Sequence, residues 1–223
     1  MRENLEIEKQ KLKTMNFKQK LEYIAEYYGL QIVIGIFIVG IIVFLCVHFA
    51  TKKDIVLNVV AVNTVTEDSP ANQREYYDSI LSKNGIDIKK SDISVNTSLK
   101  VSKDANDPLT QKNIELIESR FMANSVDLFL ANEEVLYSLA ELGFIQNLSV
   151  YLPGEVLESH SDSLVYVKDI DSGKKLLAGI HVENSDWLQK TGWYKGCQDV
   201  VVGISDNARN MEIAKDIVLE MLK

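Results

Sequence analysis

Cysteine is scarce in this chain: only Cys46 and Cys197 occur among its 223 residues. Cys46 lies inside a long apolar run, so Cys197 is the only cysteine of the polar remainder. A disulfide framework is therefore excluded there, whichever compartment that part occupies. A domain with a large enough core needs no disulfide, even outside the cell.

Positive charge is also in short supply. The chain carries 24 Lys and Arg against 32 Asp and Glu, a formal net charge of -8. Residues 1–50 contain six cations and five carboxylates, which leaves a net charge of -9 on residues 51–223. Such an acidic domain repels phosphate backbones, so nucleic acid is not expected as a partner. The remaining composition is that of a globular protein, with 46% hydrophobic residues.

Motifs of catalysis and metal binding are missing. The three histidines, His48, His160 and His181, lie far apart in the sequence, so no metal site and no cofactor is predicted. The sequence has no nucleophile elbow, phosphate-binding loop or zinc-protease motif. Cys197 has no partner motif that would make it a nucleophile. We therefore predict that the protein is not an enzyme.

One long hydrophobic run is present, "QIVIGIFIVGIIVFLCVHFA", residues 31–50. It has no Asp, Glu, Lys or Arg, and about 20 such residues suffice for a helix to cross ~30 Å of hydrocarbon. A cleaved signal peptide is the alternative, but thirty residues precede the run, and the run is longer than a signal core. The sequence predicts one transmembrane helix, with residues 31–50 in contact with the lipid bilayer.

Flanking cations predict the direction of this helix. Six Lys or Arg precede it, whereas Lys52 and Lys53 follow it closely. This bias favours a single-pass protein of the cell membrane with residues 1–30 in the cytoplasm and residues 51–223 outside. Residues 14–30 carry apolar side chains at helical spacing, which suits an amphipathic helix at the membrane surface capped by Asn16. A merely solvated flank is the alternative.

Residues 51–223 alternate between strand and helix patterns. Strands are predicted at 55–63, 92–101, 126–132, 164–182 (a hairpin of two) and 197–205, and helices near 74–83, 109–125, 132–143, 184–194 and 207–223. This order predicts an α/β fold, a largely parallel sheet flanked by helices. In the helix at 132–143, Asn132 is the expected N-cap, and Glu133 and Glu134 suit the positive end of the helix dipole.

Three stretches carry a family resemblance. "SRFMANSVDLFLANEEVLYSLAELGFIQNLSVYLP", "KLLAGIHV" and "DVVVGISDNARNMEIAKDIVLEML" resemble, in order and spacing, segments of extracellular solute-binding proteins with the type II periplasmic-binding-protein-like fold. Members of that family have two lobes that close on a ligand. Here about 20 residues, 181–200, separate the last two strands, which is too few for a second lobe. The resemblance therefore implies a single lobe on a transmembrane anchor.

Two sets of residues are candidates for binding. Ligands of open α/β sheets lie beyond the carboxyl ends of the strands, so short polar residues at those ends are expected together in one crevice, or else act as plain helix caps. They are Asn63, Thr64, Asn132, Glu133, Ser205 and Asn207. The second set is the aromatic loop of Trp187, Trp193 and Tyr194, which is expected to stack on a sugar or a partner protein; a lid that covers the sheet is the alternative.

Two functions follow from these features. The first is an accessory or scaffold protein whose external lobe docks on another protein of the cell envelope. The alternative is a tethered protein that binds or senses a small polar solute, in association with an ABC-type transporter.

Overall fold

The computed structural model describes residues 15–65, 71–104, 106–168 and 173–223. The chain divides into two units, residues 1–52 and residues 53–223, and each is described by itself. The turn predicted for the hairpin, residues 171–173, overlaps residues 169–172, which lie outside the described ranges.

The described part of the first unit, residues 15–52, contains one long helix, α2, Phe17–Thr51, of 35 residues. Asn16 begins it with a capping box: its side chain accepts from the Gln19 N–H, and the Gln19 side chain accepts from the Asn16 N–H. The predicted cap is thereby confirmed. At 1.5 Å per residue the helix is about 52 Å long. It is long and apolar enough to cross a membrane, and none of its residues is buried in the chain, unlike those of a core helix.

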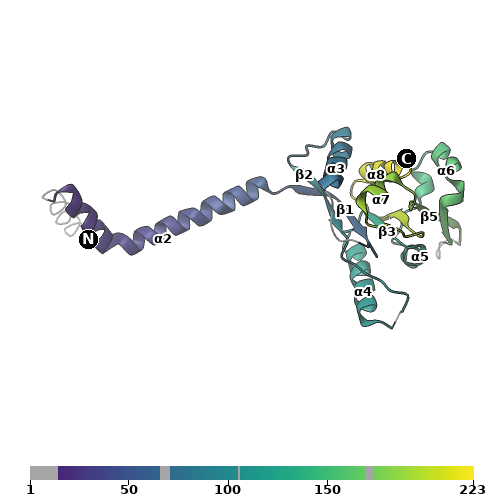
Figure 1. Ribbon diagram of the computed structural model, residues 1–223, viewed down its shortest axis with the longest axis horizontal. Coiled ribbons are helices and arrows are strands. Elements are labelled where there is room, and N and C mark those ends of the chain that lie inside the picture. Colours follow the sequence, from purple (N-terminus) through teal and green to yellow (C-terminus); the bar gives the residue numbers. More distant parts are fainter. Residues whose placement is uncertain (1–14, 66–70, 105, 169–172) are drawn as a thin grey trace. The chain divides into compact units, whose positions relative to one another are not determined.

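The second unit is built on one six-stranded sheet (Figure 1). Its strands, in the order β2-β1-β3-β6-β5-β4, are β1 (Asp54–Ala61), β2 (Ser91–Asn96), β3 (Leu128–Ala131), β4 (Leu164–Lys168), β5 (Lys175–His181) and β6 (Val201–Ile204). β1 pairs in parallel with β2 and β3, whereas the pairs β3–β6, β6–β5 and β5–β4 are antiparallel. The α/β class is confirmed, but the sheet is mixed, and the prediction of a largely parallel sheet is wrong.

Short connections account for part of this difference. A parallel pair needs a crossover of a dozen or more residues, usually a helix. Only residues 169–174 join β4 to β5, so these two strands form an antiparallel hairpin. The connection from β5 to β6 holds a helix of six residues, α7 (Asp186–Thr191), and the chain turns back so that β6 runs antiparallel to β5.

Helices cover both faces of the sheet. One apolar cluster joins the sheet to α3 (Ala71–Lys83), α7 and α8 (Met211–Met221), and a second joins it to α4 (Pro108–Met122) and α5 (Glu133–Glu141). Successive residues of β1 supply opposite faces, Val59 the first cluster and Val60 the second, as expected of a strand covered on both sides. The chain also forms α6 (Gly154–Ser159) and two 3-10 turns, at Leu148–Val150 and Ser161–Ser163, which the sequence patterns do not predict.

Two glycines bring α5 close to the sheet. A Cβ atom on Gly179 of β5 would lie 2.6 Å from Leu136 Cδ2, and one on Gly203 of β6 would lie 2.7 Å from Leu136 Cδ1. A side chain at either position would force Leu136 to shift, so glycine at both positions allows this close packing. The close packing fixes the start of α5 beside the strand ends that carry the polar candidates.

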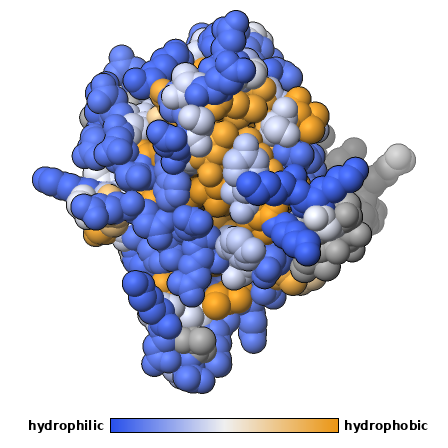
Figure 2. Space-filling view, turned by 90° about the vertical axis from the view of Figure 1, so that its right-hand side faces the viewer, coloured by the Kyte–Doolittle hydropathy of each residue, from blue (hydrophilic) through white to orange (hydrophobic). Residues whose placement is uncertain are grey.

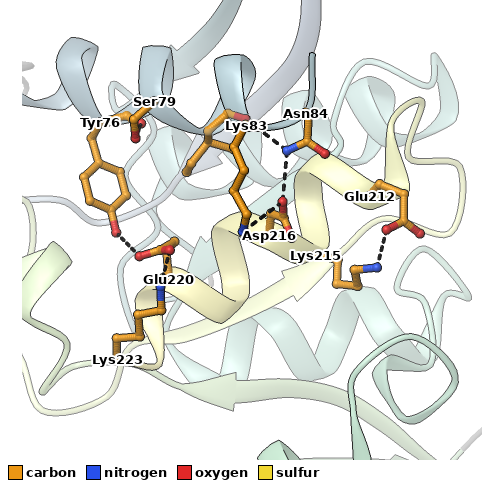
Figure 3. A network of polar contacts seen from close by, with 10 residues as sticks. Tyr76, Ser79, Lys83, Asn84, Glu212, Lys215, Asp216, Glu220 and Lys223 are labelled. Carbon is orange, nitrogen blue, oxygen red and sulfur yellow. Dashed lines mark hydrogen bonds and ion pairs between the residues drawn. The ribbon is translucent and has the colours of Figure 1, made fainter. Parts of the chain in front are cut away.

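Polar contacts join α3 to α8 (Figure 3). The Tyr76 hydroxyl donates to Glu220 Oε2 at 3.0 Å, and Asn84 Nδ2 donates to Asp216 Oδ2 at 2.9 Å. Burial, together with the hydrogen bond to Glu220, raises the pKa of Tyr76. Hydrogen bonds from Lys223 and Tyr76 outweigh burial and lower the pKa of Glu220.

Candidate functional site

The strand directions decide which residues meet at one edge of the sheet. β1, β3 and β5 end there, and β6, which runs the other way, begins there. This edge therefore gathers Asn63 after β1, Asn132 and Glu133 after β3, His181 at the end of β5, and Asp199 just before β6. We call it the cleft edge.

The same reversal separates Ser205 and Asn207 from the other candidates. Because β6 is antiparallel to β3, its carboxyl end lies at the opposite edge of the sheet. There the fully buried Ser205 donates its N–H to the Asp127 carbonyl at 2.9 Å. The prediction that Ser205 and Asn207 share a crevice with Asn63 and Asn132 is wrong, since it assumed a parallel last strand.

A cleft of about 610 Å³ lies at the cleft edge, between α4 and α5. Its walls come from the loops after β1 and β2, from both helices, and from the segment before β6. The polar side chains among its lining residues are Asn63, Ser102, Lys103, Thr110, Asn132, Glu134, Ser138, Gln198 and Asp199, and Cys197 also lines it. Among the described residues of this lining, Glu134 and Asp199 are the carboxylates and Lys103 is the only Lys or Arg.

Asn63 and Thr64 shape the cleft with side chains that are already hydrogen-bonded. Asn63 adopts a left-handed φ of 63°, which asparagine tolerates better than most residues. Its Nδ2 donates to the Val101 carbonyl at 2.8 Å, and its Oδ1 accepts from the Val101 N–H at 2.7 Å. Thr64 is buried and donates to the Thr97 carbonyl at 2.9 Å. Both residues fix the loop after β2 that forms one wall.

Asn132 occupies the N-cap position of α5 but makes no capping hydrogen bond. Instead, Asp199 Oδ1 accepts from the Glu133 N–H at 2.9 Å, so a distant carboxylate caps the helix. Asn132 Oδ1 is shielded from solvent and has no hydrogen-bond partner among the described residues. The predicted capping role of the Asn132 side chain is therefore wrong, and this cleft-lining residue keeps a buried oxygen without a partner among the described residues.

A histidine lies between carboxylates at the same edge. His181 Nε2 is 3.3 Å from Glu133 Oε2, and His181 Nδ1 is 3.3 Å from Glu183 Oε2. The contact between His181 Nδ1 and Glu183 Oε2 has the distance of an ion pair but is not aligned as a hydrogen bond. Both atoms are buried and have no hydrogen-bond partner among the described residues. Ligand atoms of Glu133, His181 and Asp199 all lie within 4.8 Å of one another, so these three residues can hold a metal ion.

The aromatic loop lies in the core. Trp187, Trp193 and Tyr194 are 4%, 0% and 5% exposed, and the two indole rings meet edge to face at 5.5 Å. The Tyr194 hydroxyl donates to the carbonyls of Val62 at 2.8 Å and Leu130 at 3.1 Å, and burial raises the pKa of Tyr194. The prediction that these rings stack on a sugar or a partner is wrong in this structure; they form a lid packed on the sheet.

Sequence reasoning missed the grouping of Glu133, His181 and Asp199. The three residues lie on separate segments, and no spacing motif connects them. Asp199 immediately precedes a predicted strand, and only the direction of β6 shows at which edge of the sheet Asp199 lies.

Comparison with known proteins identifies no relative: no family model, curated protein or solved structure matches this chain.

Proposed function

We propose that this protein is a membrane-anchored binding protein that holds a small polar solute in the cleft at the cleft edge. The observation that carries the proposal is Asn132, which lines the cleft and whose buried Oδ1 has no partner among the described residues. A buried acceptor without a partner is costly, by about 1–3 kcal/mol, and a donor group on a ligand would remove that cost.

The size and charge of the cleft agree with this proposal. Its volume of about 610 Å³ falls within the range of small-molecule sites. Glu134 and Asp199 provide two negative charges against the one positive charge of Lys103. Solutes that carry an amine, alone or together with a carboxylate, complement this lining best.

The anchor in this proposal is α2. Its length and apolar surface suit a bilayer, and the excess of cations before the apolar run favours a cytoplasmic N-terminus with the α/β domain outside. The proposed solute binding also agrees with the resemblance to a single lobe of an extracellular solute-binding protein, which we retain as part of the proposal.

Docking on another envelope protein is the second candidate function. Its expected contact, the aromatic loop, is buried. What favours it now is exposed apolar surface: Figure 2 shows apolar side chains gathered among hydrophilic ones on one face of the molecule. Independently of that view, the exposed apolar side chains of the α/β domain include Met122, Leu142 and Val150, each more than half exposed. Crosslinking in membranes that captures no protein partner would count against this candidate.

Thermal melting tests the solute proposal. The full chain, purified in detergent with a chelator present, is melted against panels of amino acids, polyamines and sugars. A solute at 100 times its Kd should stabilise the folded state by about 2.7 kcal/mol, which raises Tm by roughly 5–10 °C. Asn132→Leu should abolish the shift, whereas Asn207→Leu, at the opposite edge of the sheet, should retain it. If no solute of these panels shifts Tm, solute binding is rejected.

A further inference from the structure

We propose that Glu133, His181 and Asp199 form a binding site for a divalent cation of the zinc type, with Glu183 as the group that orients His181. The site lies on the rim of the cleft and shares Asp199 with it. This metal site does not depend on the solute proposal, because Glu133, His181 and Asp199 lie close together without any solute in the cleft.

The distances between the ligand atoms suit a small cation. Two ligands of a tetrahedral zinc ion, each about 2.0–2.1 Å from the metal, lie about 3.3 Å apart. His181 Nε2 and Glu133 Oε2 are 3.3 Å apart, and one carboxylate oxygen of Asp199 lies within 4.8 Å of a ligand atom of each of these two residues. A small movement of one exposed carboxylate therefore brings three ligand atoms around one ion.

The backbone and neighbouring side chains position each ligand. Asp199 is held by the hydrogen bond from the Glu133 N–H to its Oδ1, which leaves Oδ2 for a metal. Glu183 lies 3.3 Å from His181 Nδ1, on the far side of the ring from Glu133. The two atoms are close without the alignment of a hydrogen bond; a Glu183 carboxylate turned to accept from Nδ1–H would favour the proton on that nitrogen and leave Nε2 free to bind a metal.

Charge and chemistry indicate the class of cation. Three carboxylates surround one imidazole here, and a bound cation would relieve their mutual repulsion. An imidazole ligand favours zinc and similar transition metals over calcium and magnesium, which prefer oxygen ligands alone. The Glu133 side chain is 51% exposed, so water can fill the remaining coordination positions.

A protonated imidazole between carboxylates would give the same distances without a metal. The two explanations differ in their response to added metal, and calorimetry measures that response. The full chain, without a histidine tag, is purified in detergent, freed of metal with a chelator, and titrated with zinc chloride or calcium chloride. We expect one zinc ion per chain and binding of calcium at least tenfold weaker.

Variants test whether the proposed ligands are the residues that bind zinc. His181→Gln and Asp199→Asn should each weaken zinc binding at least tenfold, and Glu183→Gln should weaken it about tenfold through the orientation of His181. Asp199→Asn keeps an oxygen for the Glu133 N–H, so the start of α5 is preserved. His160→Gln is the matched control, since His160 contacts the carbonyls of Val156 and Leu222 instead of a carboxylate.

Three results would overturn the proposal: no zinc binding by the wild-type chain, binding that His181→Gln leaves unchanged, or binding that His160→Gln removes. Metal-free melting of each variant shows whether its fold is intact. Should His181→Gln fail to fold, Glu183→Gln and the visible spectrum of added cobalt decide the question, because a histidine–carboxylate site changes that spectrum. Failure here leaves the solute proposal intact, since its melting test is made with a chelator present.

Discussion

At the scale of single residues, several polar side chains contact parts of the chain far away in the sequence. The sequence correctly predicts a helix that begins after Asn132, but the oxygen that caps it belongs to Asp199, 66 positions beyond Glu133. Asp127 is likewise fully buried, and its carboxylate accepts from the N–H groups of Asn58 and Arg209. Local propensity cannot reveal such contacts, because they depend on how the strands are arranged.

Tyr194→Phe tests one of these long-range contacts. The change removes the hydroxyl that donates to the carbonyls of Val62 and Leu130 inside the core. We expect the free energy of unfolding to fall by about 1–2 kcal/mol, since the Val62 carbonyl loses this donor while the Leu130 carbonyl keeps the Val62 N–H. Denaturant titration followed by tryptophan fluorescence measures it, because both tryptophans are buried in this domain.

The control for this change is Tyr137→Phe, at a tyrosine that is 38% exposed. Its effect should stay within about 0.5 kcal/mol. Equal losses from the two variants would show that the Tyr194 hydroxyl does not stabilise the fold.

At the scale of elements, hydrophobic periodicity predicts most of what forms. The helix patterns near 109–125, 132–143 and 207–223 correspond to α4, α5 and α8, whose apolar sides lie in the two core clusters. Periodicity does not reveal α6, a helix of six residues, because one and a half turns are too short to show a repeat. Periodicity does not reveal strand direction either, because an apolar strand such as β6 has the same residue pattern in either direction.

Glu220→Gln tests the contact between α3 and α8. In the folded protein the pKa of Glu220 is lowered by hydrogen bonds from Lys223 and Tyr76. A lowered pKa means that the ionised group stabilises the fold above its ordinary pKa of 4.5, and that this stability is lost as pH falls through the folded pKa. At pH 7 we expect the variant to lose roughly 1 kcal/mol of unfolding free energy.

Denaturant titrations between pH 7 and pH 3 show the pH dependence. The difference between the wild type and Glu220→Gln should shrink toward zero at the acid end, because the amide resembles the protonated acid. Glu212→Gln, on the same helix with a side chain 73% exposed, is the control and should change little at any pH. A difference that grows on acidification would contradict the assigned direction of the Glu220 pKa.

At the scale of the whole molecule, composition predicts the division into parts better than it predicts the site. The uncharged run at residues 31–50 lies within α2, and the alternation of strands and helices after it gives the α/β domain. The candidate site was predicted only in part. Asn63, Asn132 and Glu133 do lie at one edge, and His181 lies there at the carboxyl end of β5. Asp199 joins them only because β6 is reversed, which the sequence does not show.

The orientation of the chain across a membrane is a prediction at this scale. In a background of Cys46→Ala and Cys197→Ala, single cysteines are introduced by Phe17→Cys, at a residue 80% exposed, or by Val150→Cys, at a residue 69% exposed. In intact cells, a maleimide that cannot cross membranes should label Val150→Cys, whereas Phe17→Cys should be labelled only after permeabilisation, because the cations before the span favour the cytoplasm. The opposite pattern would reverse the topology. A shortened chain that has lost Phe17→Cys would show that the apolar helix is a cleaved signal sequence and not an anchor.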